Sequence, residues 1–198
     1  MVFDFEGERA PFPLVFVWTK TYGMTQDLIT SRLKLRALEP GDAPRLQALC
    51  GNWEVARMLE VVPYPYPDGL AETWIGELAA RQQSDTAHIF AITLAEELIG
   101  VIGLERGDDG PFALGCWLGE AWWGQGYMSE AAARVVRFAF EDLGVAKLTS
   151  GFFSDNPASG QVLEKCGFRV MRHGSLPCRA RDEEVAAAFA ELRAGGAP

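Results

Sequence analysis

Histidine is scarce in this chain, because His88 and His173 are the only two among 198 residues. Neither stands in a pattern with a carboxylate and a serine that would form a nucleophile triad, so a hydrolase of that kind is not indicated. The four cysteines form no CxxC pair, which argues against a zinc ribbon and against a compact disulfide framework. We therefore expect no metal and a reducing, cytoplasmic setting.

Long hydrophobic runs and positive charge are also in short supply. The apolar run at residues 14–18 is much shorter than a membrane span, and the N-terminus is acidic where a signal peptide would be basic. Lys and Arg number 18 against 27 Asp and Glu, for a net charge of −9. Nucleic-acid binders usually carry clustered positive charge, so we expect neither a membrane nor a nucleic-acid partner.

The chain has the size and the composition of one globular domain, with 48% hydrophobic and 23% charged residues. Residues 1–28 differ in texture, since prolines and six aromatic residues occur there without a helical period. We predict an N-terminal arm over 1–28 and a domain over 29–198. So many aromatics favour an ordered arm that forms a lid or a homodimer interface, or that folds back on its own domain.

Strand-like and helix-like patterns alternate from residue 29 onward, which predicts an α/β fold. Strands are expected near 33–35, 88–94, 98–105, 112–118, 147–153 and 168–175, and helices near 42–49, 68–78, 130–142 and 156–166. Residues 185–192 are ambiguous. Their alanines favour a helix, whereas the architecture described below requires a final antiparallel strand there.

A glycine loop lies between an expected strand and the longest expected helix: Trp123, Gly124, Gln125, Gly126, Tyr127 and Met128. Glycines allow successive backbone N–H groups to point at an anion, and the start of a helix adds free N–H groups and a positive dipole end. A diphosphate fits such a loop; a tight turn without a ligand is the alternative. A dinucleotide is not indicated, because Ser129 stands where its fingerprint needs a third glycine.

Residues 119–131, GEAWWGQGYMSEA, resemble motif A of the GNAT acetyltransferases, in the form typical of their ribosomal-protein N-terminal acetyltransferase-like branch. Residues 155–159 (DNPAS) and 162–168 (VLEKCGF) look like the second motif of the same branch, and residues 32–36 (RLKLR) resemble its opening strand. The resemblance covers about residues 30–180.

The resemblance implies a GNAT fold, in which a mixed, mostly antiparallel sheet splays between two parallel strands, 112–118 and 147–153, with helices on both faces. It implies acetyl-CoA as cosubstrate, with its pyrophosphate on the 123–128 loop and its pantetheine arm between the splayed strands. Backbone groups of Trp117, Leu118 and Gly119 would bind that arm, and Asn156 and Ser159 would line its far wall. Helix capping is the alternative role for the last two residues.

The chemistry that the resemblance implies is direct attack of an amine on the thioester, with a backbone N–H near Leu118 stabilising the oxyanion. No protein nucleophile is needed, so Cys116 and Cys166 are interpreted as small core residues. Glu105, at the end of a central strand, is our candidate general base; a solvated strand-end carboxylate is the alternative. Leu163 stands where many members of the family carry a tyrosine acid, and Ala121 where many carry Gln or Arg.

The expected function is acetyl transfer to a primary amine, either a protein N-terminus or a small molecule such as an antibiotic or a polyamine. A non-catalytic acyl-CoA-binding regulatory module is the alternative, because the tyrosine is missing. The sequence leaves the acceptor open.

Overall fold

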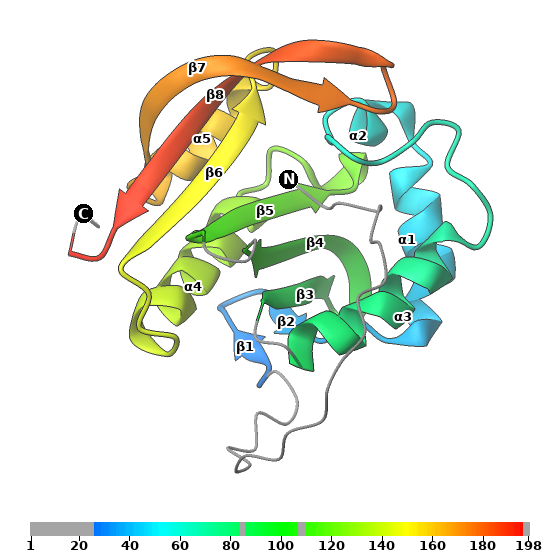
Figure 1. The fold of residues 1–198 in the computed structure, drawn as a ribbon. Helices are drawn as coiled ribbons and strands as arrows, with labels where there is room; N and C mark the ends of the chain where they lie inside the picture. The colour runs from blue at the N-terminus through cyan, green and yellow to red at the C-terminus, as the bar shows by residue number, and fades with distance from the viewer. Residues whose placement is uncertain (1–25, 84–85, 107–109, 196–198) are drawn as a thin grey trace, which may run out of the picture.

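The computed structural model describes residues 26–83, 86–106 and 110–195. Within these ranges a mixed eight-stranded sheet has helices on both faces (Figure 1). Its strands are β1 (Leu28–Ile29), β2 (Lys34–Arg36), β3 (Ala87–Leu94), β4 (Glu97–Glu105), β5 (Phe112–Leu118), β6 (Lys147–Phe153), β7 (Arg169–Cys178) and β8 (Glu183–Arg193). The helices are η1 (Pro40–Asp42), α1 (Ala43–Cys50), α2 (Trp53–Ala56), α3 (Leu70–Gln83), η2 (Glu120–Trp122), α4 (Tyr127–Glu141) and α5 (Pro157–Lys165).

The predicted N-terminal arm falls mostly outside the described residues, which begin at residue 26. Leu28, the last residue assigned to that arm, pairs with Leu35 of β2 and belongs to the sheet. The interpretation of the arm as a lid or a dimer interface stays a prediction.

The strand order is β1-β2-β3-β4-β5-β6-β8-β7. Neighbouring strands in the described sheet run antiparallel except β5 and β6, which run parallel. The fold class expected from the sequence, α/β with a mixed and mostly antiparallel sheet, is confirmed.

The parallel pair is short. Phe112 is opposite Leu148 and Ala113 is opposite Thr149, and the register between the two strands extends no further. Beyond these pairs the Ser150 hydroxyl donates to the Leu114 carbonyl at 2.9 Å, so a side chain replaces the next ladder bond. The strands then diverge (Figure 1).

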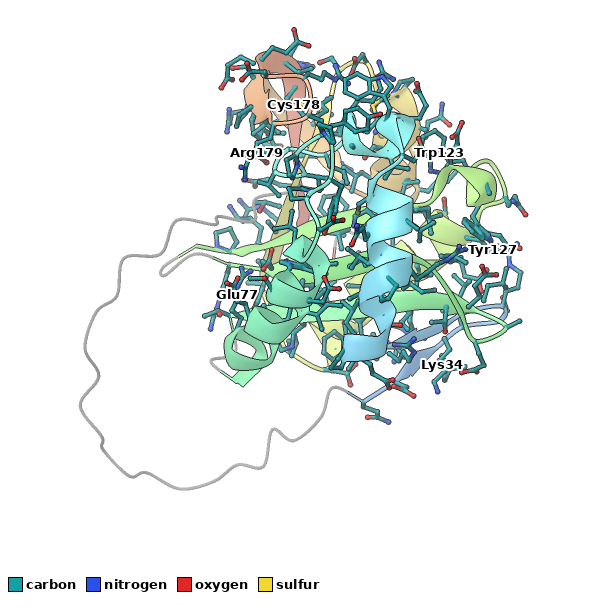
Figure 2. The ribbon with its side chains drawn as sticks, turned by 90° about the vertical axis from the view of Figure 1, so that its right-hand side faces the viewer. Lys34, Glu77, Trp123, Tyr127, Cys178 and Arg179 are labelled. Carbon is teal, nitrogen blue, oxygen red and sulfur yellow. The ribbon has the colours of Figure 1, made fainter. Side chains whose placement is uncertain are left out.

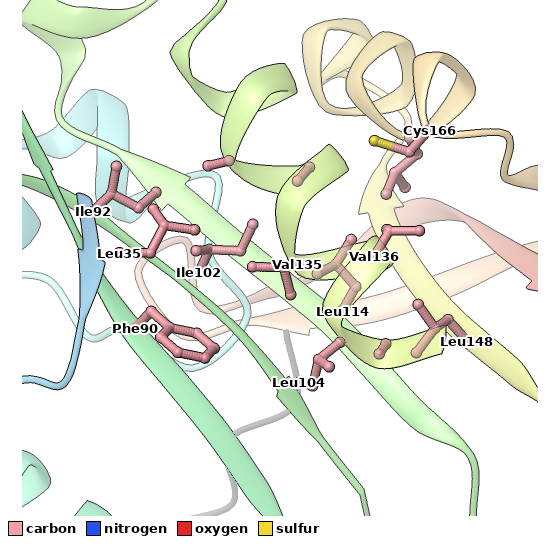
Figure 3. Packing of buried hydrophobic residues seen from close by; sticks show 14 of the residues in the cluster. Leu35, Phe90, Ile92, Ile102, Leu104, Leu114, Val135, Val136, Leu148 and Cys166 are labelled. Carbon is pink, nitrogen blue, oxygen red and sulfur yellow. The ribbon is translucent and has the colours of Figure 1, made fainter. Parts of the chain in front are cut away.

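One face of the sheet packs against α4 and α5. Phe90, Ile102, Leu104, Leu114 and Leu148 lie in this core with the helical residues Ala131, Val135 and Ala139, which are fully buried (Figure 3). These α4 residues recur every four positions and so form one apolar stripe of the helix.

The opposite face packs against α1, α2 and α3. Ile89, Val101 and Trp117 contribute from the strands, while Leu46 and Trp74 contribute from the helices. Strand residues therefore alternate between two cores, as a sheet buried on both sides requires.

The structure decides one alternative that the sequence left open and changes two local expectations. Residues 183–193 form strand β8, because seven residue pairs with β6 and nine with β7 outweigh the helix propensity of the alanines. Helix α4 begins at Tyr127 rather than Glu130. Asp42 precedes α1, but its carboxylate accepts from Arg36 at 2.7 and 2.8 Å instead of capping that helix.

We predict that Ile102→Ala destabilises the fold by about 2–5 kcal/mol, because Ile102 is fully buried against α4 and its loss leaves a cavity. Ile29→Ala is the matched control, since Ile29 is 59% exposed and should cost under about 1 kcal/mol. Urea unfolding of both variants measures the difference, and equal losses would contradict this assignment of the core.

Candidate active site

The glycine loop follows β5 through the short helix η2. Gly124 and Gly126 have φ angles of +73° and +79°, which non-glycine residues rarely adopt. Gly126 is the N-cap of α4, so the helix starts as soon as the second glycine has turned the chain. The loop predicted from the sequence therefore includes the first two residues of the helix, Tyr127 and Met128.

The backbone of this turn is arranged to bind an anion. The Glu130 N–H donates to the Gly126 carbonyl at 3.1 Å, and the N–H groups of Tyr127, Met128 and Ser129 precede this first helical bond. These groups point out of the helix at the positive end of its dipole. A Cβ added at Gly124 would have no heavy atom within 4 Å, so the space beside the loop is open.

Two side chains of the loop are used to hold its shape. The Trp123 indole donates to the Leu118 carbonyl at 2.8 Å, and the Gln125 amide donates to the Ala121 carbonyl at 3.0 Å. Figure 2 shows Trp123 and Tyr127 along one side of the molecule. The loop is thus tied back to the end of β5.

We call the diverging edges of β5 (residues 115–118) and β6 (residues 151–153) the seam. Along β5 the carbonyls of Phe112 and Leu114 face β6, because they accept from Thr149 and Ser150. Backbone direction alternates along a strand, so Cys116 and Leu118 also direct their N–H groups into the seam. An extended ligand would find strand-like partners there.

The same alternation turns Trp117 and Gly119 toward β4. Trp117 is opposite Val101, and the Gly119 N–H donates to the Ile99 carbonyl at 2.9 Å. Trp117, Leu118 and Gly119 were predicted to bind the pantetheine arm. Of these three, Leu118 is the one whose N–H faces the seam. Cys116, which sequence reasoning did not select, is the second.

The far side of the seam leads to the start of α5. Asn156 is the N-cap of α5, and its side chain accepts from the Ser159 N–H at 3.2 Å. The capping role considered for these residues is thus present, and both side chains keep partial exposure. Capping fixes the Asn156 side chain at the end of β6.

A segment after α2 is bound to the β7–β8 turn. Arg181 donates to the Arg57 carbonyl at 2.7 Å and to the Asp155 carboxylate at 2.7 Å, and the Arg179 N–H donates to the Glu60 carbonyl at 2.9 Å. Figure 2 shows Cys178 and Arg179 close to this part of the chain. We call residues 57–60 the strap, because it connects the α1 side of the sheet to the end of β6.

Comparison with known proteins gives a family match over most of the chain. Residues 32–169 match the acetyltransferase (GNAT) domain model. An uncharacterised N-acetyltransferase of Bacillus licheniformis is 26% identical over 151 residues, which are 73% of this chain and 83% of that protein. The uncharacterised N-acetyltransferase YoaA of Bacillus subtilis is 30% identical over 146 residues, 72% of this chain and 82% of that protein.

This chain belongs to the GNAT acetyltransferase family. It is an acetyl-CoA-dependent N-acetyltransferase, as predicted. Among solved structures, the ribosomal-protein α-N-acetyltransferase RimL in complex with coenzyme A matches with a TM-score of 0.75 at 18% identity, covering 85% of this chain and 98% of that one. That likeness shows that the two chains share a fold.

Glu105, the candidate base of this GNAT protein, lies at the far end of β4. It is opposite Ala113, two residues before the seam begins, and forms an ion pair with Arg81 of α3. Burial raises the pKa of Glu105 to about 7, and Arg81 lowers it only in part. Its carboxylate form therefore increases as the pH rises through neutrality. Its role as a base stays a prediction.

The thiols of the site are not activated. Burial raises the pKa of Cys116 to about 12 and that of Cys166 to about 11, so both remain protonated at neutral pH. Their interpretation as small core residues agrees with this. Leu163, which stands in the place of the tyrosine acid, is buried in the α4 core and offers no proton.

Elsewhere in the described residues, the predicted site residues form no second ligand site. A hollow of about 1100 Å³ lies among α5, β6, β7 and β8, and none of the predicted site residues lines it. Among all the residues that the structure describes, no group of three or more His, Cys, Asp and Glu side chains could hold a metal ion. None of the helices in this part of the chain has the length and apolarity of a membrane span.

Sequence reasoning missed the residues that reach the site from distant segments. Arg32 and Glu130 meet beside the glycine loop although 98 positions separate them. Arg181 meets Asp155 beside the strap, and the Arg179 N–H meets the Glu60 carbonyl in it. Burial raises the pKa of Glu60. Local patterns carry no signal for such pairs, apart from the presence of Glu130 in the motif and Arg32 in the opening strand.

If Glu105 is the base, Glu105→Gln should lower kcat by about 10²-fold and remove a rise in rate through about pH 7. Glu97→Gln is the matched control, because Glu97 lies on the same strand and also pairs with an arginine, Arg45. Initial rates from pH 5.5 to 9 give the comparison. Wild-type rates for Glu105→Gln over this range would assign the proton transfer to water or to another group.

Proposed function

We propose that this protein transfers the acetyl group of acetyl-CoA to a primary amine, on a protein N-terminus or a small molecule, by direct attack. The observation that carries the proposal is the seam between β5 and β6, which leads directly to the glycine loop at the start of α4. An extended donor with a diphosphate at one end fits this combination.

The diphosphate of the donor would lie on residues 123–128. The N–H groups of Tyr127 and Met128 and the two glycines with positive φ support this assignment, since they offer donors without side chains in the way. Trp123 and Gln125 would hold the loop in shape through their bonds to Leu118 and Ala121.

The pantetheine arm would pair like a strand with the seam. The N–H groups of Cys116 and Leu118 support this on the β5 side, with Asn156 and Ser159 at the far end. The Leu118 N–H would also stabilise negative charge on the thioester oxygen during attack. A fixed donor of this kind needs no reorganisation as the charge develops.

The acceptor would approach from the side of the strap. The net charge of −9 favours a cationic acceptor. A peptide α-amine has a pKa of about 7.7–8.0, so a weak base or an ordered water is enough to deprotonate it. Glu105 is opposite Ala113 while Leu118 is opposite Gly100, so Glu105 would act through water.

An acceptor screen tests the proposal. Peptides with free N-termini, polyamines and aminoglycosides are incubated with acetyl-CoA, and thiol release and product mass are measured. Acetylated product identifies both the acceptor and the reacting amine. CoA binding without thiol release from any acceptor would favour the alternative, a non-catalytic acyl-CoA-binding regulatory module, for which the buried Leu163 in place of a tyrosine is the argument.

Gly126→Val should weaken CoA binding by at least about 10-fold, because a branched side chain would enter the space beside the free N–H groups. Gly144→Val is the matched control: Gly144 also has positive φ and open space around it, but it lies after α4, away from the loop. Both substitutions place a β-branched residue at a positive φ. Calorimetric titration with CoA measures the difference, and equal affinities in the two folded variants would refute the loop assignment.

A further inference from the structure

Arg32 lies in the turn between β1 and β2 and reaches the glycine loop. Its Nη1 donates to the Gln125 carbonyl at 3.1 Å, and its guanidinium lies 4.5 Å from the centre of the Tyr127 ring. Its Nε donates to Glu130 at 2.6 Å. One side chain thus contacts the middle of the loop, the first residue of α4 and the first turn of that helix.

Glu130 fixes this arginine and the turn that carries it. Its carboxylate accepts from the Thr30 hydroxyl at 2.6 Å, from the Ser31 hydroxyl at 2.9 Å and from the Arg32 N–H at 2.8 Å, in addition to Arg32 Nε. Burial opposes its ionisation, but these bonds outweigh burial and lower the pKa of Glu130 to about 2. Glu130 is therefore a carboxylate at any working pH.

The remaining nitrogen of Arg32 faces the diphosphate space. Nη2 lies 3.5 Å from where a Cβ at Gly126 would be, and it takes part in no hydrogen bond with the residues that the structure describes. The Arg32 side chain is 44% exposed, so a ligand on the loop can reach it. Ala121, in η2 just before the loop, offers no cation.

We propose that Arg32 binds the diphosphate of the donor through Nη2, and that Glu130 is a positioning residue that holds Arg32 for this contact. The assignment rests on the proposed function, because it requires the diphosphate on residues 123–128. The guanidinium fork suits the task, since Nε is committed to Glu130, Nη1 to the Gln125 carbonyl, and Nη2 is left for a phosphate oxygen. A residue from the β1–β2 turn thus supplies a cationic donor that the loop itself lacks.

Three ligands separate this role from a general effect on folding. CoA carries the diphosphate and a 3′-phosphate, 3′-dephospho-CoA keeps the diphosphate alone, and pantetheine has neither. Arg32→Ala should weaken CoA and 3′-dephospho-CoA by the same factor, about 10-fold or more, and leave pantetheine within about twofold of wild type. Added salt should weaken CoA binding less in the variant than in wild type.

Companion variants sharpen the test. Arg32→Lys keeps the charge without the fork and should fall between wild type and Arg32→Ala. Glu130→Gln keeps the shape and should weaken CoA about 3- to 10-fold without affecting pantetheine. Arg137→Ala is the control for charge, because Arg137 lies ten positions along α4 from Tyr127, is 57% exposed and should bind CoA as wild type does.

Each other outcome overturns the assignment in a distinct way. Unchanged CoA affinity in Arg32→Ala removes the contact, and an equal loss for pantetheine reduces Arg32 to a structural residue. A loss for CoA but not for 3′-dephospho-CoA moves the contact to the 3′-phosphate. If the wild-type protein fails to bind CoA, the proposed function itself is overturned. If wild type and Arg32→Ala bind CoA equally well, only the Arg32 contact is overturned.

Discussion

Two residue pairs hold β5 and β6 together before the strands separate, and the site depends on that divergence. Each strand is fixed on its outer side, since all seven residues of β6 pair with β8 and six residues of β5 pair with β4. Closing the seam would therefore require the outer neighbour of each strand to move with it. The backbone groups that face the seam are therefore kept available, although unpaired groups in a sheet are costly unless a ligand or water satisfies them.

Close packing at the ends of both strands supports this geometry. A Cβ at Gly119 would come within 2.9 Å of Trp122, and a Cβ at Gly160 would come within 2.8 Å of Phe152. A larger residue at either position would clash with the aromatic ring, so only glycine allows this close packing. The first contact holds the end of β5 beside the glycine loop. The second holds α5 against β6. The separation of the strands is thus determined by packing on both sides of the seam.

The two faces of the sheet present different electrostatics to the seam. On the α4 face, the helix start and Arg32 favour an anion beside the loop. At the strap, the buried carboxyl of Glu60 and the ion pair of Arg181 with Asp155 mix both charges, within a chain whose net charge is −9. The start of α4 and Arg32 would therefore draw the phosphates of the donor to one side of the opening.

Local sequence was enough to predict the α/β class, most strands and helices, and the glycine loop, because these depend on periodicity and on backbone freedom at Gly124 and Gly126. The tertiary structure alone decided the rest. Pairing on both sides made a strand of the alanine-rich residues 183–193, strand direction turned Cys116 and Leu118 rather than Trp117 toward the seam, and contacts across 98 positions joined Arg32 to Glu130. Such features depend on which distant segments become neighbours in the folded chain. A local pattern of residue types does not show which segments these are.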